Sequence, residues 1–299
     1  MDVNKGAIKE VSVNLMTAGY CTHREWLTIQ GGSGASVRFP AMFAYIEHPR
    51  LGSILFDTGY STRFFQATSA FPARLYRWTT PVYIGEDESA ANQLRNLGVM
   101  PEDVRTIILS HFHADHIGGV CDFANAEFYY LREAYRPLQD MSPFQATKAG
   151  FLPGLLPDRF GDRSRLIEET CSQINLDEGY APFTEGYDLF GDGSIIGINL
   201  SGHALGQLGL LLRSAGHEYF LCADAAWSTA AYASHRRPKS IVKLIKANWQ
   251  QYKDNLHRLH ILHRRRPDLR IIPTHCREAE QWYVTSPKVQ GGAQWIKER

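Results

Sequence analysis

One short segment carries the densest chemistry in the sequence. Three histidines and one aspartate fall within six consecutive residues, in the order His-x-His-x-Asp-His. These four residues are His111, His113, Asp115 and His116. Residues 104–109, just before them, are apolar and predict a buried strand, and Gly118 and Gly119, just after them, permit a tight turn. We therefore expect a reactive loop at the end of a core strand, held at the surface by a rigid scaffold.

The spacing within this cluster suits a metal site. Side chains at positions i and i+2 of an extended backbone point to the same side, so His111 and His113 can bind one ion. Asp115 and His116 then point toward a second position nearby. Imidazole together with carboxylate suits zinc, and also iron, manganese or cobalt. A surface loop that is rich in histidine by chance is the alternative, but such dense clusters are typical of metal sites.

Length and charge narrow the class of protein. The chain has 299 residues, 44% of them hydrophobic, which is enough for one large domain or two small ones. Its 32 basic and 31 acidic residues leave a net charge of +1, whereas nucleic-acid binders usually carry a marked basic excess. We find no apolar run of roughly 18 residues, the length of a membrane-spanning helix, and no leader-like pattern at the N-terminus. We expect a cytoplasmic protein that binds neither nucleic acid nor membrane.

Four further polar residues each follow an apolar run that predicts a strand. The predicted strands cover residues 53–56, 195–200, 219–221 and 269–273, and the residues that follow them are Asp57, His203, Asp224 and His275. A single aspartate or histidine at a strand end is more often a turn or capping residue than a ligand. These four residues therefore indicate a metal site only because they occur together with the histidine-rich cluster.

These strand ends and the His-x-His-x-Asp-His cluster resemble, in order, the motifs of the metallo-β-lactamase-fold hydrolases. The resemblance runs from Asp57 to His275 and implies an α/β fold, an αββα sandwich of two mixed β-sheets flanked by helices. It implies two divalent metal ions, most often zinc, with iron, manganese and cobalt as alternatives. One ion would be held by His111, His113 and His203, the other by Asp115, His116 and His275, with Asp224 bridging them. Asp57 would be no ligand but would fix the metal loop by hydrogen bonds.

The same resemblance implies hydrolysis by a hydroxide that bridges the metals, with Asp115 passing a proton to the leaving group. A bridging Asp224 departs from true β-lactamases and is shared by glyoxalase II, lactonases and several phosphodiesterases. The layout is most similar to that of N-acyl-homoserine lactone lactonases, which act in quorum quenching on a small lactone. Those enzymes often carry a tyrosine three residues after the bridging aspartate. Here that residue is Trp227, which donates from its indole N–H but cannot accept or titrate.

Two other classes of function stay open. A phosphodiesterase, or another ester or thioester hydrolase of this fold, is the first, and a cluster of Lys and Arg at the cleft would favour a phosphodiesterase. A non-enzymatic metal or redox module is the second. Flavin-linked relatives of that kind need an appended flavodoxin-like domain, for which this chain has no room. A degenerate binding module is disfavoured because all seven ligand positions are filled.

Two segments outside the motifs are expected to shape the substrate site within a single domain of residues 1–299. Residues 60–83 are rich in aromatic residues and predict a long loop with a short helix, which lines a cleft, packs on the sheet or forms a homodimer interface. Residues 132–174 are rich in Pro and Gly and predict an irregular insertion covering one side of the site. From these segments and the fourth motif we assign Phe64, Phe151 and Trp227 to substrate binding.

Other features are assigned structural roles. Helices are predicted at residues 86–97 and 240–266, and the second contains His257, His260 and His263. We interpret these histidines as the cationic flank of a helix C-terminus in preference to a metal site. The five cysteines include no Cys-x-x-Cys pair, which disfavours a disulfide scaffold. Cys222 and Cys276 lie near predicted ligands, and we favour buried thiols over thiolate ligands.

Overall fold

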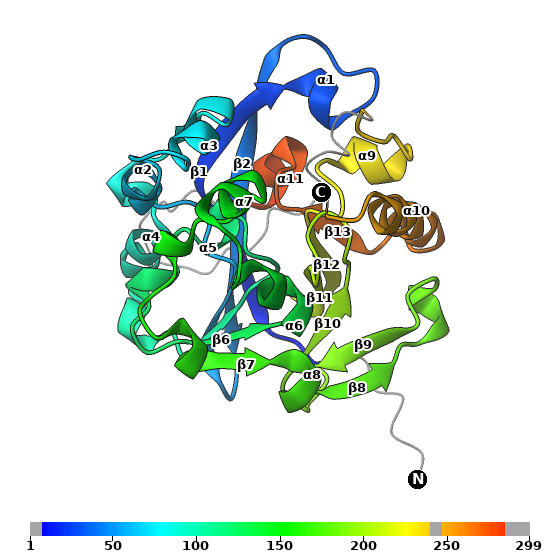
Figure 1. The fold of residues 1–299 in the computed structure, drawn as a ribbon. Coiled ribbons are helices and arrows are strands. Elements are labelled where there is room, and N and C mark those ends of the chain that lie inside the picture. The colour runs from blue at the N-terminus through cyan, green and yellow to red at the C-terminus, as the bar shows by residue number, and fades with distance from the viewer. Residues whose placement is uncertain (1–7, 240–246, 285–299) are drawn as a thin grey trace.

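The computed structural model describes residues 8–239 and 247–284. Two mixed β-sheets pack face to face, and helices cover both outer faces, as Figure 1 shows. The predicted αββα sandwich is therefore confirmed.

The first sheet has seven strands in the order β4-β1-β2-β3-β5-β6-β7. Its strands are β1 (Ser12–Arg24), β2 (Ser36–His48), β3 (Gly52–Phe56), β4 (Val82–Tyr83), β5 (Thr106–Ile108), β6 (Glu127–Tyr130) and β7 (Ser164–Leu166). β1, β2 and β3 form an antiparallel meander, and β3, β5, β6 and β7 run parallel. As a result, β3 and β5 end side by side at the same edge of the sheet.

The second sheet has six strands in the order β13-β12-β11-β10-β9-β8. Its strands are β8 (Ser172–Asn175), β9 (Glu185–Asp188), β10 (Ile195–Asn199), β11 (Leu208–Ser214), β12 (His217–Ala223) and β13 (Arg270–Pro273). β12 and β13 are parallel, whereas β11 is antiparallel to both β10 and β12. β10, β12 and β13 therefore all end at one edge, which places the loops after them together.

The described helices are short, except for one. They are α1 (Glu25–Thr28), α2 (Arg63–Ala67), α3 (Arg74–Thr79), α4 (Ala90–Asn96), α5 (Ala114–Ile117), α6 (Arg132–Tyr135), α7 (Pro143–Lys148), α8 (Ile167–Thr170), α9 (Thr229–Ala233), α10 (Trp249–Arg265) and α11 (Arg277–Tyr283). Turns of 3₁₀ helix lie at η1 (Glu86–Glu88), η2 (Pro101–Asp103), η3 (Val120–Asp122), η4 (Arg136–Leu138), η5 (Pro153–Leu155), η6 (Phe160–Arg163) and η7 (Glu178–Tyr180).

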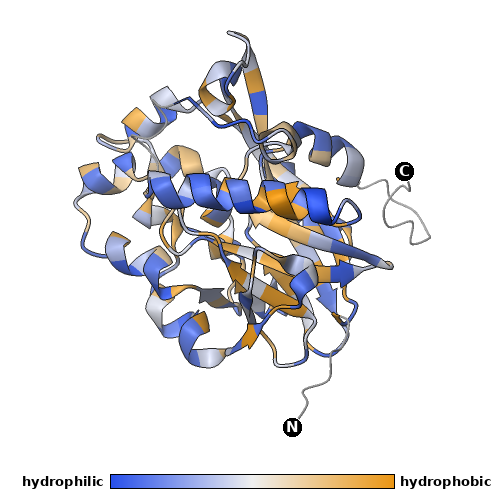
Figure 2. Ribbon diagram, turned by 90° about the vertical axis from the view of Figure 1, so that its right-hand side faces the viewer, coloured by the Kyte–Doolittle hydropathy of each residue, from blue (hydrophilic) through white to orange (hydrophobic). Residues whose placement is uncertain are grey.

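Three apolar cores correspond to the three interfaces of the sandwich. The core between the sheets joins residues such as Ile46 and Ile54 of the first sheet to Leu210 and Leu221 of the second. A second core packs the outer face of the first sheet against the helices and loops of the N-terminal half. A third packs the second sheet against α9 and α10. In Figure 2 apolar colour gathers in the strands between the helices, as expected when burial of apolar area drives the packing.

Two predicted helices differ from those observed. Residues 86–97 split into η1 and α4, because the side chain of Ser89 accepts a hydrogen bond from the Asn92 N–H and so begins a new helix. In the predicted helix 240–266, residues 240–246 lie outside the described part. α10 begins after Asn248, whose side chain caps its first turn, and ends at Arg265. His260 donates from Nδ1 to the carbonyl oxygen of Tyr232, so it helps to dock α10 on α9.

The two segments assigned to the substrate site are more regular than expected. Residues 60–83 contain two helices, α2 and α3, in place of one, and also the edge strand β4. Residues 132–174 contribute β7 to the first sheet and β8 to the second, in addition to short helices. The prediction of an irregular insertion was wrong in this respect, because strands of three or four residues carry too little periodicity to be recognised in sequence.

Candidate metal centre

All the predicted ligands lie in segments that follow the C-terminal ends of strands, and Asp115 and His116 lie in the short helix α5. The cluster of residues 110–119 follows β5, His203 follows β10, Asp224 follows β12, and His275 follows β13. The parallel pairs β3/β5 and β12/β13 supply neighbouring loops in each sheet, and stacking the two sheets brings these loops together. The order of the strands thus explains how residues so distant in sequence meet.

The loop after β5 is held in place by the loop after β3. The Thr58 N–H donates to the carbonyl oxygen of His116 over 2.9 Å, and the Gly119 N–H donates to Thr58 Oγ1 over 3.0 Å. A Cβ on Gly118 would lie 2.6 Å from the carbonyl oxygen of Gly59. The glycine therefore permits a close approach of the two backbones, whereas the sequence analysis expected it to permit a tight turn.

Asp57 connects this scaffold to a ligand. Its carboxylate accepts hydrogen bonds of 2.7 Å from both the N–H and the hydroxyl of Ser110. The same carboxylate lies 2.7 Å from Nδ1 of His116. A ring N–H that is held by a carboxylate directs the lone pair of the other ring nitrogen, here Nε2, toward the site. Asp57 is thus placed where an orienting residue is needed.

Four side chains form a first cluster, with ligand atoms within 4.8 Å of one another: His111, His113, His203 and Asp224. Nδ1 of His113 lies 3.0 Å from Nε2 of His111 and 2.9 Å from Nε2 of His203. Nε2 of His203 also lies 3.1 Å from an oxygen of Asp224. Three imidazole nitrogens and a carboxylate oxygen that converge in this way match the donor set of a zinc-type site.

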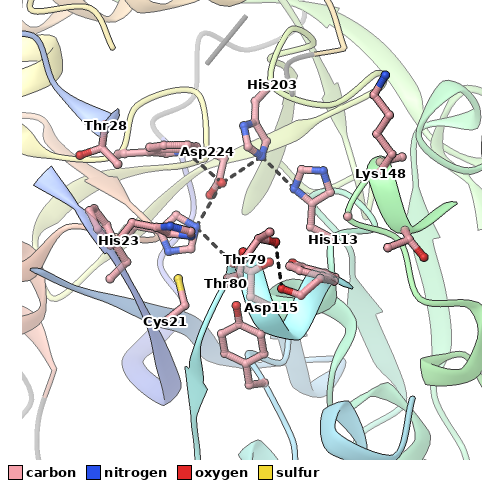
Figure 3. A pocket seen from close by; sticks show the side chains of 18 of the residues that line it. Cys21, His23, Thr28, Thr79, Thr80, His113, Asp115, Lys148, His203 and Asp224 are labelled. Carbon is pink, nitrogen blue, oxygen red and sulfur yellow. Dashed lines mark hydrogen bonds and ion pairs between the residues drawn. The ribbon is translucent and has the colours of Figure 1, made fainter. Parts of the chain in front are cut away.

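Asp115, His116 and His275 form a second cluster. Nε2 of His275 lies 3.3 Å from Asp115 Oδ2 and 3.1 Å from Asp224 Oδ2. Nε2 of His116 lies 3.4 Å from Asp224 Oδ1. Asp224 therefore faces ligands of both clusters, and the dashed lines of Figure 3 run from it to its neighbours.

The polar atoms of the second cluster fit a cation. Nδ1 of His275 donates to the carbonyl oxygen of Pro40 over 2.7 Å, which leaves the Nε2 lone pair facing the carboxylates. Within the described residues, Nε2 of His116 and Oδ1 of Asp224 are buried and make no hydrogen bond. Because an unmade hydrogen bond at a buried polar atom is costly, such atoms facing one another indicate a metal position.

Electrostatics keeps two of the ligands, Asp224 and His111, in the forms that bind metal. For His116 and His275, burial lowers the pKa but nearby carboxylates outweigh it, so the pKa of each imidazole is raised. Burial raises the pKa of Asp224, but the imidazoles of His275, His203 and His116 outweigh it and hold that pKa well below its usual range. Burial, together with the neighbouring imidazoles of His116 and His113, holds the pKa of His111 well below that of a free histidine. A carboxylate and a neutral imidazole are the protonation states that coordinate a cation.

Trp227 lies against the same cluster. Its indole Nε1–H donates to Asp224 Oδ2 over 3.1 Å, and its ring lies edge-on to those of His203 and His275. It also lines the cavity that opens over the ligands. The residue that we assigned to substrate binding is thus also a hydrogen-bond donor to the carboxylate between the two clusters.

A cavity of about 320 Å³ opens directly onto the ligands. Its lining includes metal ligands, Trp227 and residues of α3 and α7, and Figure 3 labels Thr79 of α3 and Lys148 of α7 near His113 and Asp224. Phe64 and Phe151 are not part of this lining, since both are buried in the core of the first sheet. Their assignment to substrate binding was wrong, although residues of the same segments, such as Tyr76 and Lys148, do line the cavity.

Sequence reasoning missed Gly150. It has φ of +74°, and a Cβ there would lie 2.9 Å from Cδ2 of His113. Its carbonyl oxygen also accepts a hydrogen bond from the Ala114 N–H. The end of α7 is thus fastened to the metal loop. Gly150 occurs in a glycine-rich segment without a motif, so nothing in the sequence distinguished it.

The cysteines near the site are not part of either cluster. Cys222 is fully buried, and burial raises the pKa of its thiol. Cys276 lies 3.3 Å from the Thr229 N–H and accepts a hydrogen bond from it. Cys222 and Cys276 are both buried, which fits the prediction of buried thiols.

The sequence matches the model of a protein family over residues 43–256, and that family is the metallo-β-lactamase superfamily. The chain belongs to the metallo-β-lactamase superfamily. It is therefore a hydrolase of that superfamily, and the two His/Asp clusters are where this fold binds divalent metal. Among the helices that the structure describes, none has the length and apolar character needed to cross a membrane.

Two similar proteins illustrate its place within the superfamily. The probable metallo-hydrolase Rv2300c of Mycobacterium tuberculosis is 30% identical over 235 residues, covering 75% of this chain and 71% of that protein. The N-acyl homoserine lactonase AttM of Azorhizobium caulinodans is 28% identical over 185 residues, covering 61% of this chain and 63% of that one.

Solved structures show the same fold. A variant of AiiA from B. thuringiensis with N-decanoyl-L-homoserine bound at its active site has a TM-score of 0.67 and 19% identity. The match covers 91% of this chain and 96% of that one. This likeness covers a larger share of the chain than residues 43–256 do.

Proposed function

We propose that this chain is a dinuclear metal-dependent lactonase that opens the ring of N-acyl-homoserine lactones and so silences quorum-sensing signals. The observation that carries the proposal is the meeting of seven ligand side chains, in two clusters around Asp224, at the base of one cavity. AttM is an N-acyl homoserine lactonase, and the AiiA variant has N-decanoyl-L-homoserine bound at its active site, which supports this substrate class.

The donor set fits two divalent ions, and we propose zinc. His111, His113 and His203 hold the first ion, and Asp115, His116 and His275 hold the second, with Asp224 between them. When bound, the ions polarise the ester carbonyl and make a water molecule nucleophilic near neutral pH. Imidazole-rich sites with few carboxylates favour zinc over magnesium or calcium.

Asp115 is placed to manage the proton. It belongs to the second cluster and also lines the cavity, with Oδ2 3.3 Å from Nε2 of His275 and its side chain largely buried. We assign it the roles of accepting a proton from the attacking water and giving it to the ring oxygen that leaves. Overall, the reaction consumes one lactone and one water molecule and forms one hydroxy acid.

Trp227 is assigned to positioning the substrate. It forms part of the cavity wall, and its N–H is held by Asp224, so its ring edge presents a fixed surface to the bound ring. Because Trp227 cannot accept a hydrogen bond at nitrogen, the substrate contact differs from one made by a tyrosine at this position.

The charge of the cavity disfavours phosphodiesters. Lys148 is the single Lys or Arg among its described lining residues. Sites for the phosphodiester backbone of nucleic acids usually present several cations, because each phosphate carries a full charge. A neutral ester or lactone agrees better with this lining.

The test is to measure metal content and hydrolysis of an acyl-homoserine lactone, followed by acid release, on one purified sample. We expect about two metals per chain and fast ring opening, lost in Asp115→Asn while Asp162→Asn, an exposed control remote from the ligands, retains it. Two metals without lactone turnover would move the function to other esters. Less than one metal per chain, after zinc or manganese is supplied during expression, would overturn the proposal.

A further inference from the structure

Charge is distributed unevenly along the chain. Residues 225–267 hold ten of the 32 Lys and Arg residues but only one of the 31 Asp and Glu residues, which is Asp254. This segment therefore carries a formal charge of +9 and the rest of the chain −8, so the net charge of +1 conceals a strongly basic region. The expectation that the protein binds no nucleic acid depended on that net charge, which says nothing about a single face of the molecule.

The described part of this segment gathers basic side chains on one side of α10. Lys253, His257, His260 and Arg264 recur every three or four residues, so they form one stripe along the helix, about 16 Å long. All four are exposed or half-buried, whereas the residues that α10 buries lie on another side, against the second sheet. Asp254 lies off the stripe and lines a separate cavity beside α10. In Figure 2, which looks onto this side of the molecule, α10 crosses the front and is largely hydrophilic in colour.

The turn after α9 extends the stripe. The ring centroid of His235 lies 5.0 Å from that of His257 and 5.2 Å from that of His260. Burial lowers the pKa of His235, and the nearby Arg237, His257 and His260 lower it further, which indicates a positive potential at this place. The basic face is defined here by six residues: His235, Arg237, Lys253, His257, His260 and Arg264.

Acidic side chains do not neutralise the cations of the basic face. Among the residues that the structure describes, Arg237, Lys253 and Arg264 form no ion pair, whereas the neighbouring Arg266 lies 2.6 Å from Glu218. A surface charge without an acidic partner contributes fully to the field that attracts an anionic ligand. The basic face therefore suits a partner that carries several negative charges.

The side chains around the basic face distinguish between anionic partners. In the described part of residues 229–266, no large apolar side chain is exposed. A helix that binds a membrane surface inserts apolar side chains, and protein interfaces depend on aromatic and apolar anchors. The backbone of a nucleic-acid duplex needs neither, because its phosphates are bound by charge and hydrogen bonds.

We propose that the basic face binds the phosphate backbone of a double-stranded nucleic acid, without reading its sequence. None of the six residues lines the cavity over the metal ligands. The duplex is therefore bound on a surface remote from that cavity and is not a substrate. The inference goes beyond the proposed function and does not depend on it.

The first test titrates the metal-loaded protein into a fluorescently labelled DNA duplex of about 20 base pairs and follows the anisotropy at KCl concentrations from about 50 to 200 mM. We expect micromolar binding at the lowest salt concentration and a steep loss of affinity as salt is added. Each neutralised phosphate contributes about −0.9 to the slope of log K against log salt concentration, so roughly three or four contacts predict a slope of about −3 to −4.

The second test removes charge from the basic face. Lys253→Gln combined with Arg264→Gln is compared with Arg95→Gln combined with Arg105→Gln, a control that removes the same charge from exposed residues of α4 and of the segment before β5, on the side of the first sheet. We expect the first pair to bind the duplex at least tenfold more weakly at low salt and to reduce the magnitude of the slope by about 2. The control pair is expected to match the wild type within about twofold.

Circular dichroism checks the fold of both double variants. Should the first pair fail to fold, Arg237→Gln combined with His257→Gln removes basic groups from another part of the same face, and weaker duplex binding is expected again. Absence of duplex binding by the wild type at the lowest salt concentration, or equal slopes in the basic-face and control variants, would overturn the proposal.

Two competing partners are tested under the same conditions: vesicles that contain phosphatidylglycerol, and a polyglutamate peptide. We expect both to bind the wild-type protein more weakly than the duplex does. Vesicles or polyglutamate that bind as tightly as the duplex would assign the basic face to a membrane surface or to an acidic protein, and would overturn the nucleic-acid partner.

Discussion

Two parts of the lining of the cavity over the metal ligands differ in how deeply they are buried. The metal edge, formed by the seven ligands, is fixed by buried loops, and Asp57 bonds both the loop backbone and His116. The rest of the lining, here called the substrate wall, includes residues of α3 and α7. α3 has no buried residue, and in α7 only Ala146 is buried. We infer that the metal chemistry sits on a buried frame, whereas α3 and α7, which bury few residues, can change and alter substrate choice.

The largest expected effect breaks the metal edge without disturbing its shape. Asp115→Asn keeps the size of the side chain but removes the group that we assign to proton transfer, and we expect kcat to fall by about 10²–10⁴-fold. The measurement is steady-state hydrolysis of a lactone, with metal content determined on the same protein. Retention of more than a tenth of the activity at full metal content would show that Asp115 moves no proton.

A smaller effect is expected from changing Asp57, which contacts a ligand but is not one itself. Asp57→Asn retains a residue that tolerates the left-handed conformation at φ +59°, but it removes the negative charge facing Nδ1 of His116. We expect metal affinity to fall by about 10–100-fold. Competition with a chelator measures this directly, and circular dichroism checks the fold. Unchanged affinity would mean that Asp57 serves the backbone of the loop alone.

Gly150→Ala tests the connection between the two sides. The new Cβ would contact the His113 ring. The alanine would also have to adopt a positive φ, which costs about 1–2 kcal/mol. We expect weaker metal binding, by roughly tenfold or less, since only part of the strain reaches the ligand.

Gly161→Ala is the matched control for this change, because no atom lies within 4 Å of a Cβ at that position and its φ is not positive. Equal metal affinities in the two variants would show that α7 is not fastened to the metal site through Gly150.

The smallest expected effect on catalysis comes from a core residue, and a cavity residue changed in the same way provides the comparison. Phe151→Leu trims a core residue, so we expect the free energy of unfolding to fall by roughly 1–2 kcal/mol and kcat/KM to change less than about twofold. Phe144→Leu changes an exposed residue of α7 that lines the cavity, and the reverse pattern is expected. Denaturant unfolding and lactone kinetics distinguish them. Loss of long-chain activity in Phe151→Leu at unchanged stability would restore Phe151 to the substrate site.

The sequence was informative where chemistry demands particular residue types at fixed places. Ligands such as His111 and His203 follow strands that periodicity reveals, and the structure brings them together as the resemblance implied. The two mixed sheets flanked by helices also agree with the fold that the resemblance implied.

The substrate side was not predictable to the same degree. Aromatic residues serve cores more often than clefts, and Phe64 and Phe151 follow that rule. The roles of Gly150 and Lys148 depend on how α7 is seated against His113, a tertiary contact that leaves no local pattern. Strands as short as β7 and β8 are defined by their partners in the sheets and not by their own sequence.

The central claim is that seven side chains form one dinuclear centre around Asp224. The most direct test is a zinc titration of chelator-treated protein, followed by calorimetry, in wild type and in Asp224→Asn. The account predicts about two equivalents bound by wild type, and loss of at least one of them when the shared carboxylate becomes an amide. A wild-type protein that binds one equivalent or fewer, or an Asp224→Asn variant that binds two with unchanged affinity, would contradict it.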